Sequence, residues 1–463
     1  MSKARKQATD TKTRRRPSQG KAGKRQQTYC WQELIQGIRR FLPRKGLPLQ
    51  VAGKRVRWTP RLLVICVLLM VWSQSQALAD RFADARLATI KIHKSRRRPG
   101  KTYEGFMASL CGMSKELLDR VCNTLRASVQ EIAGSHWTVE GWILFGADGT
   151  KVECPMTRAN EKRFGCAGKR NSTPQQFLTM VLHLGTGLPW AWIRGHGRSS
   201  ERRHLRRMVK LLPENSMLVA DAGFTGYELL SSILDSGRQF IVRVGSNVRL
   251  LKKLGYAFKE REGTVYLWPE DKRKKCPPLV LRLVTLHDGR KPMYLLTSVL
   301  APAKLSDAAV GRIYRLRWGI EVHYRSLKQT MGKRKMHSDC PRHARVELDW
   351  TVVGHWIMQL LAVSELIAAG KDPRSCSVAE SLRVLRKMMK EPDQRCGRGA
   401  LGRRLRAAVK DTYVRTSSKK ARHWPRKKTE KPPGRPKMRM ATKTEIREAQ
   451  VFKIEQAPLR FAA

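Results

Sequence analysis

Acidic residues are scarce in this sequence. Its 463 residues include 94 Lys and Arg but only 37 Asp and Glu, which gives a formal net charge of +57 and a pI near 10.9. Few soluble enzymes carry such a charge unless they act on a polyanion. Nucleic acid is therefore the leading partner that the composition indicates. An anionic membrane surface is the rival, but no long basic amphipathic helix supports it.

Paired cysteines are also missing. None of the ten cysteines stands in a Cys-x-x-Cys pair, and Cys154 and Cys166 have no histidines nearby at the spacing of a zinc finger. A zinc ribbon and a disulfide framework are therefore disfavoured. We expect free cysteines in a reducing cytoplasm.

No apolar run makes a convincing membrane span. Leu62–Trp72 has only about half the length that a span needs. It also lies too far from the N-terminus, behind too much charge, for a secretory signal. The longer run Val346–Ala368 is interrupted by Glu347, Asp349 and His355. We predict that both runs are buried core helices and that the chain has no membrane partner.

Changes in composition divide the chain into five segments. They are a basic arm at 1–27, a small all-α domain with a possible role in DNA binding at 28–135, a catalytic domain at 136–365, a helical region at 366–415, and a basic tail at 416–463. The arm and residues 416–447 have too few apolar side chains to bury a core, so we expect these basic termini to be disordered.

The central segment predicts an α/β fold. Buried strands at 142–148, 177–184 and 189–195 precede a helix at 201–212, and a strand at 216–221, a helix at 227–235 and a strand at 239–244 follow. Three strands, a helix, a strand, a helix and a strand is the order of a ribonuclease H-like catalytic core. A β-rich insertion follows at about 246–300.

One helix after this insertion carries most of the information in the chain. Ser306 is placed to cap it, and Tyr314, Arg317, Glu321 and Lys328 fall within about 60° of one another on one face, along about 21 Å. That arrangement suits a metal-binding carboxylate flanked by groups that hold several phosphates. From the helix alone, a solvated amphipathic face with ordinary i,i+4 charge pairs explains the pattern equally well.

Two further carboxylates favour a metal site. Asp148 ends the first predicted strand, and Asp221 ends the fourth, which pairs beside the first in this fold. Taken singly, Asp148 is typical of a turn and Asp221 of a helix N-cap. Three converging carboxylates, including Glu321, make an oxygen-rich site suited to Mg²⁺ or Mn²⁺. Two such ions about 4 Å apart activate a water or a 3′-hydroxyl and stabilise the leaving oxygen of a phosphodiester.

These motifs resemble those of a known family. Tyr314, Arg317, Glu321 and Lys328 fit the signature Tyr, two residues, Arg, three residues, Glu, six residues, Lys. The segments Asp221-Ala-Gly-Phe and Ala147-Asp148-Gly-Thr stand upstream in the expected order. The chain therefore resembles the DDE transposases of bacterial insertion sequences, in the branch called the insertion-sequence-four family, over residues of about 140 to 365.

The resemblance implies a transposase that cuts DNA at the ends of an insertion sequence and joins the 3′-OH into target DNA. It implies that Asp148, Asp221 and Glu321 bind two Mg²⁺ or Mn²⁺ ions. Its partners would be double-stranded DNA, at the transposon ends and the target, and further copies in a homodimer or larger synaptic complex. A bacterial, nucleoid-associated cytoplasmic location follows. The alternatives are a ribonuclease H-like nuclease without strand transfer and a non-catalytic DNA-binding descendant.

The resemblance also implies that Tyr314, Arg317 and Lys328 contact phosphates near the transposon end. Trp268 lies in the β-rich insertion, where some relatives stack a flipped base on a tryptophan, although packing within its own sheet explains it as well. Arg435 lies in the segment Pro433–Lys437, which resembles the core of an AT-hook. A plain electrostatic tail is the alternative for that segment.

Four other residues near these motifs receive plainer interpretations. We expect His196, between two glycines, to be a loop residue, although it could approach DNA, and Trp318 to be a packing residue of the motif helix. Glu153 and Glu201 are interpreted as surface charges.

Overall fold

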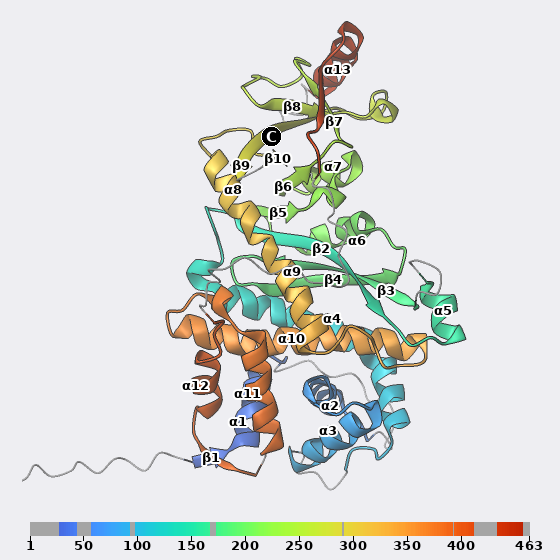
Figure 1. The fold of residues 1–463 in the computed structure, drawn as a ribbon, viewed down its shortest axis with the longest axis vertical. Coiled ribbons are helices and arrows are strands. Elements are labelled where there is room, and N and C mark those ends of the chain that lie inside the picture. Colours follow the sequence, from blue (N-terminus) through green and yellow to red (C-terminus); the bar gives the residue numbers. More distant parts are fainter. Residues whose placement is uncertain are drawn as a thin grey trace, which may run out of the picture.

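A ten-stranded mixed β-sheet runs through the upper part of the protein, as the computed structural model shows (Figure 1). Its strand order is β12-β7-β8-β9-β10-β6-β5-β2-β3-β4. The residues that the structure describes are 27–43, 57–92, 98–166, 173–288, 291–391, 393–411 and 433–456.

One half of this sheet, from β6 to the edge strand β4, contains the five strands expected from the sequence. They are β2 (Ile143–Glu153), β3 (Gln175–His183), β4 (Leu188–His196), β5 (Ser216–Ala220) and β6 (Gln239–Val244). Strands β2, β3 and β4 pair antiparallel, whereas β5 pairs parallel to β2 and β6 parallel to β5. The first strand differs from the prediction because it continues past Asp148 to Glu153, held there by its pairing with β3.

The β-rich insertion continues the same sheet. Its strands are β7 (Arg249–Lys252), β8 (Thr264–Leu267), β9 (Leu279–Asp288) and β10 (Lys291–Thr297). Strand β10 pairs antiparallel to β6, with Tyr294 opposite Val244, so backbone hydrogen bonds join the insertion to strands β2 to β6. The sheet therefore gives the insertion a fixed position relative to strands β2 to β6.

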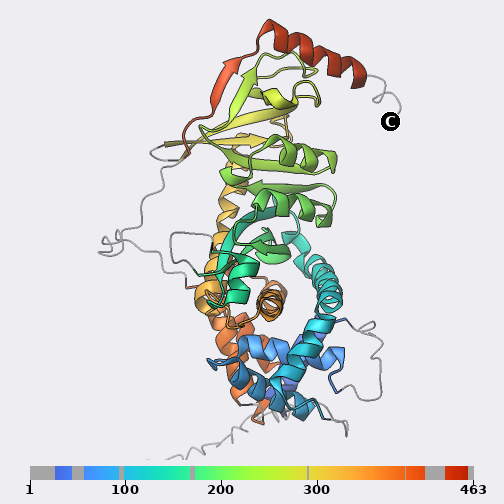
Figure 2. The same ribbon diagram turned by 90° about the vertical axis from the view of Figure 1, so that its right-hand side faces the viewer.

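Helix α10 (Pro341–Ala368) lies at the centre of the lower half. Figure 2 looks nearly along its axis and shows the sheet, α4 and the lower helices around it. It is long and apolar enough to cross a membrane, but most of its apolar stretch is buried inside the protein. The prediction of a core helix is confirmed for this segment.

Further helices complete the lower half. They are α1 (Cys30–Arg40), α2 (Pro60–Trp72), α3 (Leu78–Ile92), α4 (Tyr103–Ala133), α11 (Val378–Lys390) and α12 (Ala400–Arg406). The predicted buried helix at 62–72 is confirmed as α2, whose N-terminus is capped by the Thr59 hydroxyl. Helix α1 packs against α11 and α12, and β1 (Gln27–Tyr29) pairs with β11 (Arg395–Gly397). Segments far apart in the sequence thus form one helical body.

The basic tail contains regular structure, which corrects our prediction of disorder over 416–447. Strand β12 (Lys437–Met440) pairs parallel to β7 and forms the edge of the sheet, and α13 (Lys443–Gln456) follows it. Residues 1–26 and 412–432 lie outside the described residues. Composition predicted disorder because it reports the charge of a segment but not the unpaired edge of a distant strand that can bind it.

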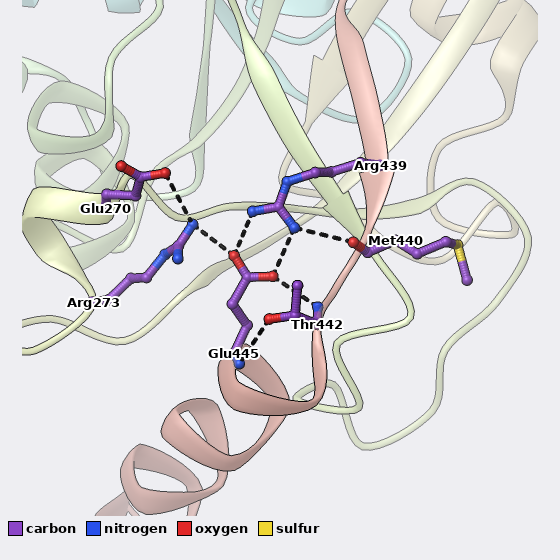
Figure 3. A network of polar contacts seen from close by, with 6 residues as sticks. All are labelled: Glu270, Arg273, Arg439, Met440, Thr442 and Glu445. Carbon is purple, nitrogen blue, oxygen red and sulfur yellow. Dashed lines mark hydrogen bonds and ion pairs between the residues drawn. The ribbon is translucent and has the colours of Figure 1, made fainter.

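A buried carboxylate fastens this C-terminal segment to the insertion (Figure 3). Glu445, on α13, is only 2% exposed, and its oxygens accept hydrogen bonds from Arg439 at 2.7 Å and from the Thr442 amide at 2.8 Å. The Arg273 guanidinium, from the insertion, lies 2.6 Å away. These contacts, led by the hydrogen bond from Arg439, lower the pKa of Glu445 to about 2.

We predict that Glu445→Gln loosens β12 and α13 without unfolding the rest of the protein. The amide cannot balance two guanidinium groups, and a hydrogen bond to a charged group contributes about 1.5–3 kcal/mol. Hydrogen exchange of the backbone amides of 437–456 should therefore speed up, while that of α10 stays slow. Glu448→Gln, on the same helix, is the matched control. Equal protection of 437–456 in both variants would show that Glu445 does not fasten the segment.

Candidate active site

The two aspartates lie side by side because of the register of the parallel strands. Strands β2 and β5 pair from Ile143 opposite Ser216 to Ala147 opposite Ala220. Asp148 and Asp221 are the next residue on each strand, at the point where the parallel pairing ends. Each carboxylate accepts a hydrogen bond of 2.8 Å from the backbone amide of the following residue. That local bond orients both side chains at the same edge of the pairing.

The motif helix is interrupted where the sequence predicted one continuous helix. Helix α8 (Asp307–Leu316) ends before Arg317, α9 (Trp318–Arg325) follows, and Ser326–Thr330 form a π-helical turn. Ser306 caps α8 as predicted, by accepting a hydrogen bond from the Ala309 amide. A π-helical turn inside a helix is common at functional sites and shifts the direction of the residues beyond it.

The four motif side chains still reach the ends of the strands. The Tyr314 hydroxyl makes a long hydrogen bond of 3.4 Å to Asp221. Arg317 and Glu321 form an ion pair at 2.7 Å, with the guanidinium side chain only 12% exposed. The Lys328 ammonium donates to the Thr150 hydroxyl at 2.6 Å. The segment thus contacts both strand ends through different residues.

A buried tyrosine that the sequence analysis did not identify fixes α9 to the sheet. The Tyr324 hydroxyl donates to the backbone carbonyl of Asp148 at 2.7 Å and accepts from the Met180 amide at 3.1 Å. It therefore joins α9, β2 and β3 at the residue that carries the first carboxylate. Its position three residues after Glu321 was the available signal, but a tyrosine at that spacing is also typical of simple core packing.

The local charges change the acidity of these groups. Burial raises the pKa of Asp148 to about 6, and the nearby Glu321 and Asp221 carboxylates add to this, whereas the Gly149 amide and Arg317 oppose it. Burial, together with the charge of Asp221, raises the pKa of Tyr314 to about 12. Burial and the neighbouring Arg334 lower the pKa of Lys328. The site is thus an acidic group within a strongly basic surrounding.

Comparisons with known proteins agree with this geometry. Residues 145–353 match the family model described as a transposase DDE domain. The transposase InsG of insertion sequence element IS4, from Escherichia coli strain K12, is 26% identical over 270 residues, or 55% of this chain and 60% of that protein. Both matches are to transposases, and the relative from Escherichia coli is the transposase of an IS4 element.

Two further similarities are more distant. A transposase for insertion sequence element IS4SA from Synechocystis is 20% identical over 187 residues, which is 39% of this chain and 52% of that protein. The piggyBac transposase in a synaptic complex with hairpin DNA has a TM-score of 0.40 and 11% identity, with 84% of each chain covered. The chain spans about 60% of the length of the first of these IS4-type relatives and about half of the second.

DDE transposases generally use divalent metal ions, and the carboxylates of Asp148, Asp221 and Glu321 are of the kind that such ions bind. Their oxygens are hard donors, and their mutual repulsion around Asp148 is the condition that a bound cation relieves. Within the described ranges, no three His, Cys, Asp or Glu side chains are grouped closely enough to hold a metal ion as they stand. Glu321 is instead engaged in its ion pair with Arg317. The donor chemistry of the three carboxylates therefore fits a divalent cation.

Trp268 and Arg435 belong to other parts of the protein, the β-rich insertion and the C-terminal segment. Trp268 is 3% exposed, and its indole nitrogen donates to the Cys276 carbonyl at 2.8 Å, which favours the packing interpretation. Arg435 is exposed beside β12. The neighbouring Pro433 packs closely against Gly245, so this segment lies along the sheet.

The plainer interpretations had mixed outcomes. Trp318 is 54% exposed, so the expectation of a packing residue was wrong, because α9 turns that side chain away from the sheet. His196 ends β4 and is exposed, although it accepts a hydrogen bond from the Arg198 amide. Glu153 forms a surface ion pair with Arg334 at 3.7 Å.

Glu201 is the residue that the sequence analysis placed wrongly. It is half-buried rather than a free surface charge, and the carboxylates of Asp148 and Asp221 both raise its pKa, in addition to the larger effect of burial. It begins α6 (Glu201–Met208), on the segment between the two aspartates. No spacing rule marked it, because its approach to the site depends on how α6 packs on the sheet.

We predict that Asp148→Asn stabilises the metal-free protein above pH 6. The folded-state pKa of about 6 lies above the ordinary value of 3.8, so the folded state keeps a proton that the unfolded state loses. The contribution of protonated Asp148 to the free energy of unfolding is therefore fully present below pH 4 and is lost as the pH rises through 6. Removing the charge should recover roughly 1–3 kcal/mol above that window, since each pKa unit corresponds to about 1.4 kcal/mol.

Urea unfolding in chelator between pH 4 and 8 measures this effect. Asp119→Asn, an exposed aspartate on α4, is the control and should show no such trend. A stability difference between Asp148→Asn and wild type that stays constant across the range would contradict the assigned pKa.

Proposed function

We propose that this protein is a transposase that cleaves DNA at the ends of an insertion sequence and transfers the 3′-OH into target DNA. One observation carries the proposal: Asp148 and Asp221 follow directly on the last residue pair of two parallel strands, and the segment bearing Glu321 crosses that edge. The match to the transposase DDE domain model and the similarity to the IS4 transposase support the same conclusion.

The arrangement of strands β2 to β6 supports a ribonuclease H-like catalytic core. Three antiparallel strands, β2, β3 and β4, lie beside two strands parallel to the first, β5 and β6. The β-rich insertion enters after β6 and precedes the motif segment. This arrangement matches the order predicted from the sequence for residues 136–365.

We assign Asp148, Asp221 and Glu321 as the ligands of two Mg²⁺ or Mn²⁺ ions. When bound, these ions supply the charge that activates a water or 3′-hydroxyl and stabilises the leaving oxygen. The chain itself fixes the ligands: the Gly149 and Ala222 amides orient the two aspartates, and Tyr324 holds the backbone of Asp148. Glu321 is held by Arg317 until it takes its place in the site.

Three basic or phenolic side chains are suited to hold phosphates. Arg317 has five donor hydrogens, and its ion pair with Glu321 leaves others for a phosphodiester. Lys328 bonds to Thr150 with one of its three donors. Tyr314 stays protonated because its pKa is about 12, so its hydroxyl remains a donor. Together they line the approach to the carboxylates.

The partners follow from the charge and from the reaction. A net charge of +57 favours double-stranded DNA, both the element ends and the target. Holding two ends at once requires a homodimer or larger complex, in the bacterial cytoplasm and associated with the nucleoid. We assign exposed Arg435 to a phosphate contact rather than to an AT-hook, since Pro433 is packed on the sheet. A base-stacking role for Trp268 would require its buried ring to be uncovered.

We predict that Asp148→Asn, Asp221→Asn and Glu321→Gln each reduce cleavage and joining by at least about 100-fold, while the variants still fold and bind element ends. Loss of a group that only supports a metal ligand already costs 10–100-fold. Gel assays on duplexes taken from the DNA flanking the gene would measure both steps. Glu131→Gln, an exposed residue of α4, is the control and should retain activity.

The same assay separates the rival functions. Cleavage without joining by the wild type, at ends that carry a free 3′-OH, would identify a nuclease. End binding with no cleavage in Mg²⁺ or Mn²⁺ would identify a non-catalytic DNA-binding protein. Normal cleavage by any one variant would remove that residue from the site.

We predict that Arg317→Ala and Lys328→Ala weaken binding to a pre-cut end more than the carboxylate variants do, with Arg317→Ala the more severe. Both remove a cation placed for phosphates, and only the arginine can bind a phosphate through two parallel hydrogen bonds. Binding titrations at several salt concentrations would measure this, with exposed Lys115→Ala as the control. Wild-type affinity in both variants would favour a role limited to charge pairing on the helix.

A further inference from the structure

The carboxylate of Glu201 lies between the two strand ends that carry the aspartates. A Cβ atom placed on Gly149 would come within 2.8 Å of one Glu201 carboxylate oxygen. A Cβ atom on Gly223 would come within 2.5 Å of the other. Gly149 follows Asp148, and Gly223 stands two residues after Asp221. Each carboxylate oxygen therefore occupies space that a side chain would fill at any residue other than glycine.

Two contacts hold the start of α6 in this place. The His204 ring bonds to the Thr179 hydroxyl of β3 at 2.9 Å, and both groups are buried. The Arg202 guanidinium donates to the Gly223 carbonyl at 2.7 Å. Helix α6 is thus tied to β3 on one side and to the loop after Asp221 on the other. The position of Glu201 follows from the packing of the helix and not from a free surface loop.

The Glu201 carboxylate has neighbours of its own charge. Asp148 and Asp221 are both close enough to repel it, and Arg202 supplies the attraction that partly offsets them. Within the described part of the chain, the Glu201 carboxylate forms neither a hydrogen bond nor an ion pair. Three carboxylates that converge without a shared cation repel one another, and a divalent cation removes that cost.

We propose that Glu201 is a fourth carboxylate of the active site and, after its side chain and those of Asp148 and Asp221 move closer together, holds a divalent cation with them. The inference rests on the proposed function, since it adds a ligand to the same site. It gives the site a ligand from α6, in addition to those from the strand ends and from α9. The alternative role for Glu201 is structural, as an acidic residue in the first turn of a helix.

The test is Mn²⁺ binding by the full-length protein without DNA, measured by calorimetry. Glu201→Gln should weaken Mn²⁺ affinity by about 10–100-fold. Glu104→Gln is the matched control, because Glu104 is also an acidic residue in the first turn of a helix but is exposed and remote on α4. Cleavage by Glu201→Gln should recover partly as the Mn²⁺ concentration is raised. A structural residue would show no such recovery.

A second variant tests the geometry without changing a charge. An added Cβ at Gly223 meets only Glu201 among its neighbours, so Gly223→Ala should displace that carboxylate and weaken Mn²⁺ binding. In a Glu201→Gln background the same change should add little, because the two substitutions act through one contact. Additive losses would mean that Gly223 acts independently of Glu201.

The outcomes separate this inference from the proposed function. Weaker Mn²⁺ binding in both Asp148→Asn and Glu201→Gln supports both. Weaker binding in Asp148→Asn alone, with Glu201→Gln folded and unchanged, overturns the fourth carboxylate and leaves the transposase site intact. No Mn²⁺ binding by the wild type, together with no metal-dependent cleavage of DNA, overturns both.

Discussion

The hydroxyl of Tyr324 is the contact on which the geometry of the site depends. It donates a hydrogen bond to the backbone carbonyl of Asp148 and accepts one from the backbone amide of Met180. One side chain of α9 is therefore hydrogen-bonded to the two neighbouring strands β2 and β3. Because the group is buried, the bond also satisfies backbone atoms that would otherwise be costly to bury. The packing of α9 on the sheet therefore fixes the position of the helix segment that carries Glu321 relative to the two aspartates.

Charge balance is the second constraint. Carboxylates gathered at one sheet edge repel one another, and this repulsion adds to the larger effect of burial in raising the pKa of Asp148. The protein opposes this repulsion with the Gly149 amide and with Arg317, within a chain whose overall charge is strongly positive. The same cations suit the phosphates of DNA, the substrate that we propose, so one distribution of charge would both tolerate the acidic cluster and attract DNA.

The insertion and the C-terminal segment extend this framework. Pairing of β10 with β6 makes the insertion part of the sheet, and β12 adds a further strand beyond it. Glu445 joins that strand, α13 and Arg273 of the insertion through one buried carboxylate. A chain segment that returns from the far end of the molecule thus finishes the sheet edge, where an unpaired β7 would otherwise be exposed.

The sequence by itself determined the order of strands β2 to β6, the positions of the two aspartates at strand ends and the spacing of Tyr314 to Lys328. These are local patterns, because hydrophobic period and short-range spacing are written in neighbouring residues. Only the tertiary structure decided that Glu201 joins the acidic edge, that the motif helix breaks at Arg317 and that β12 is ordered. Each of these depends on contacts between residues far apart in the chain, whose energy no local pattern records.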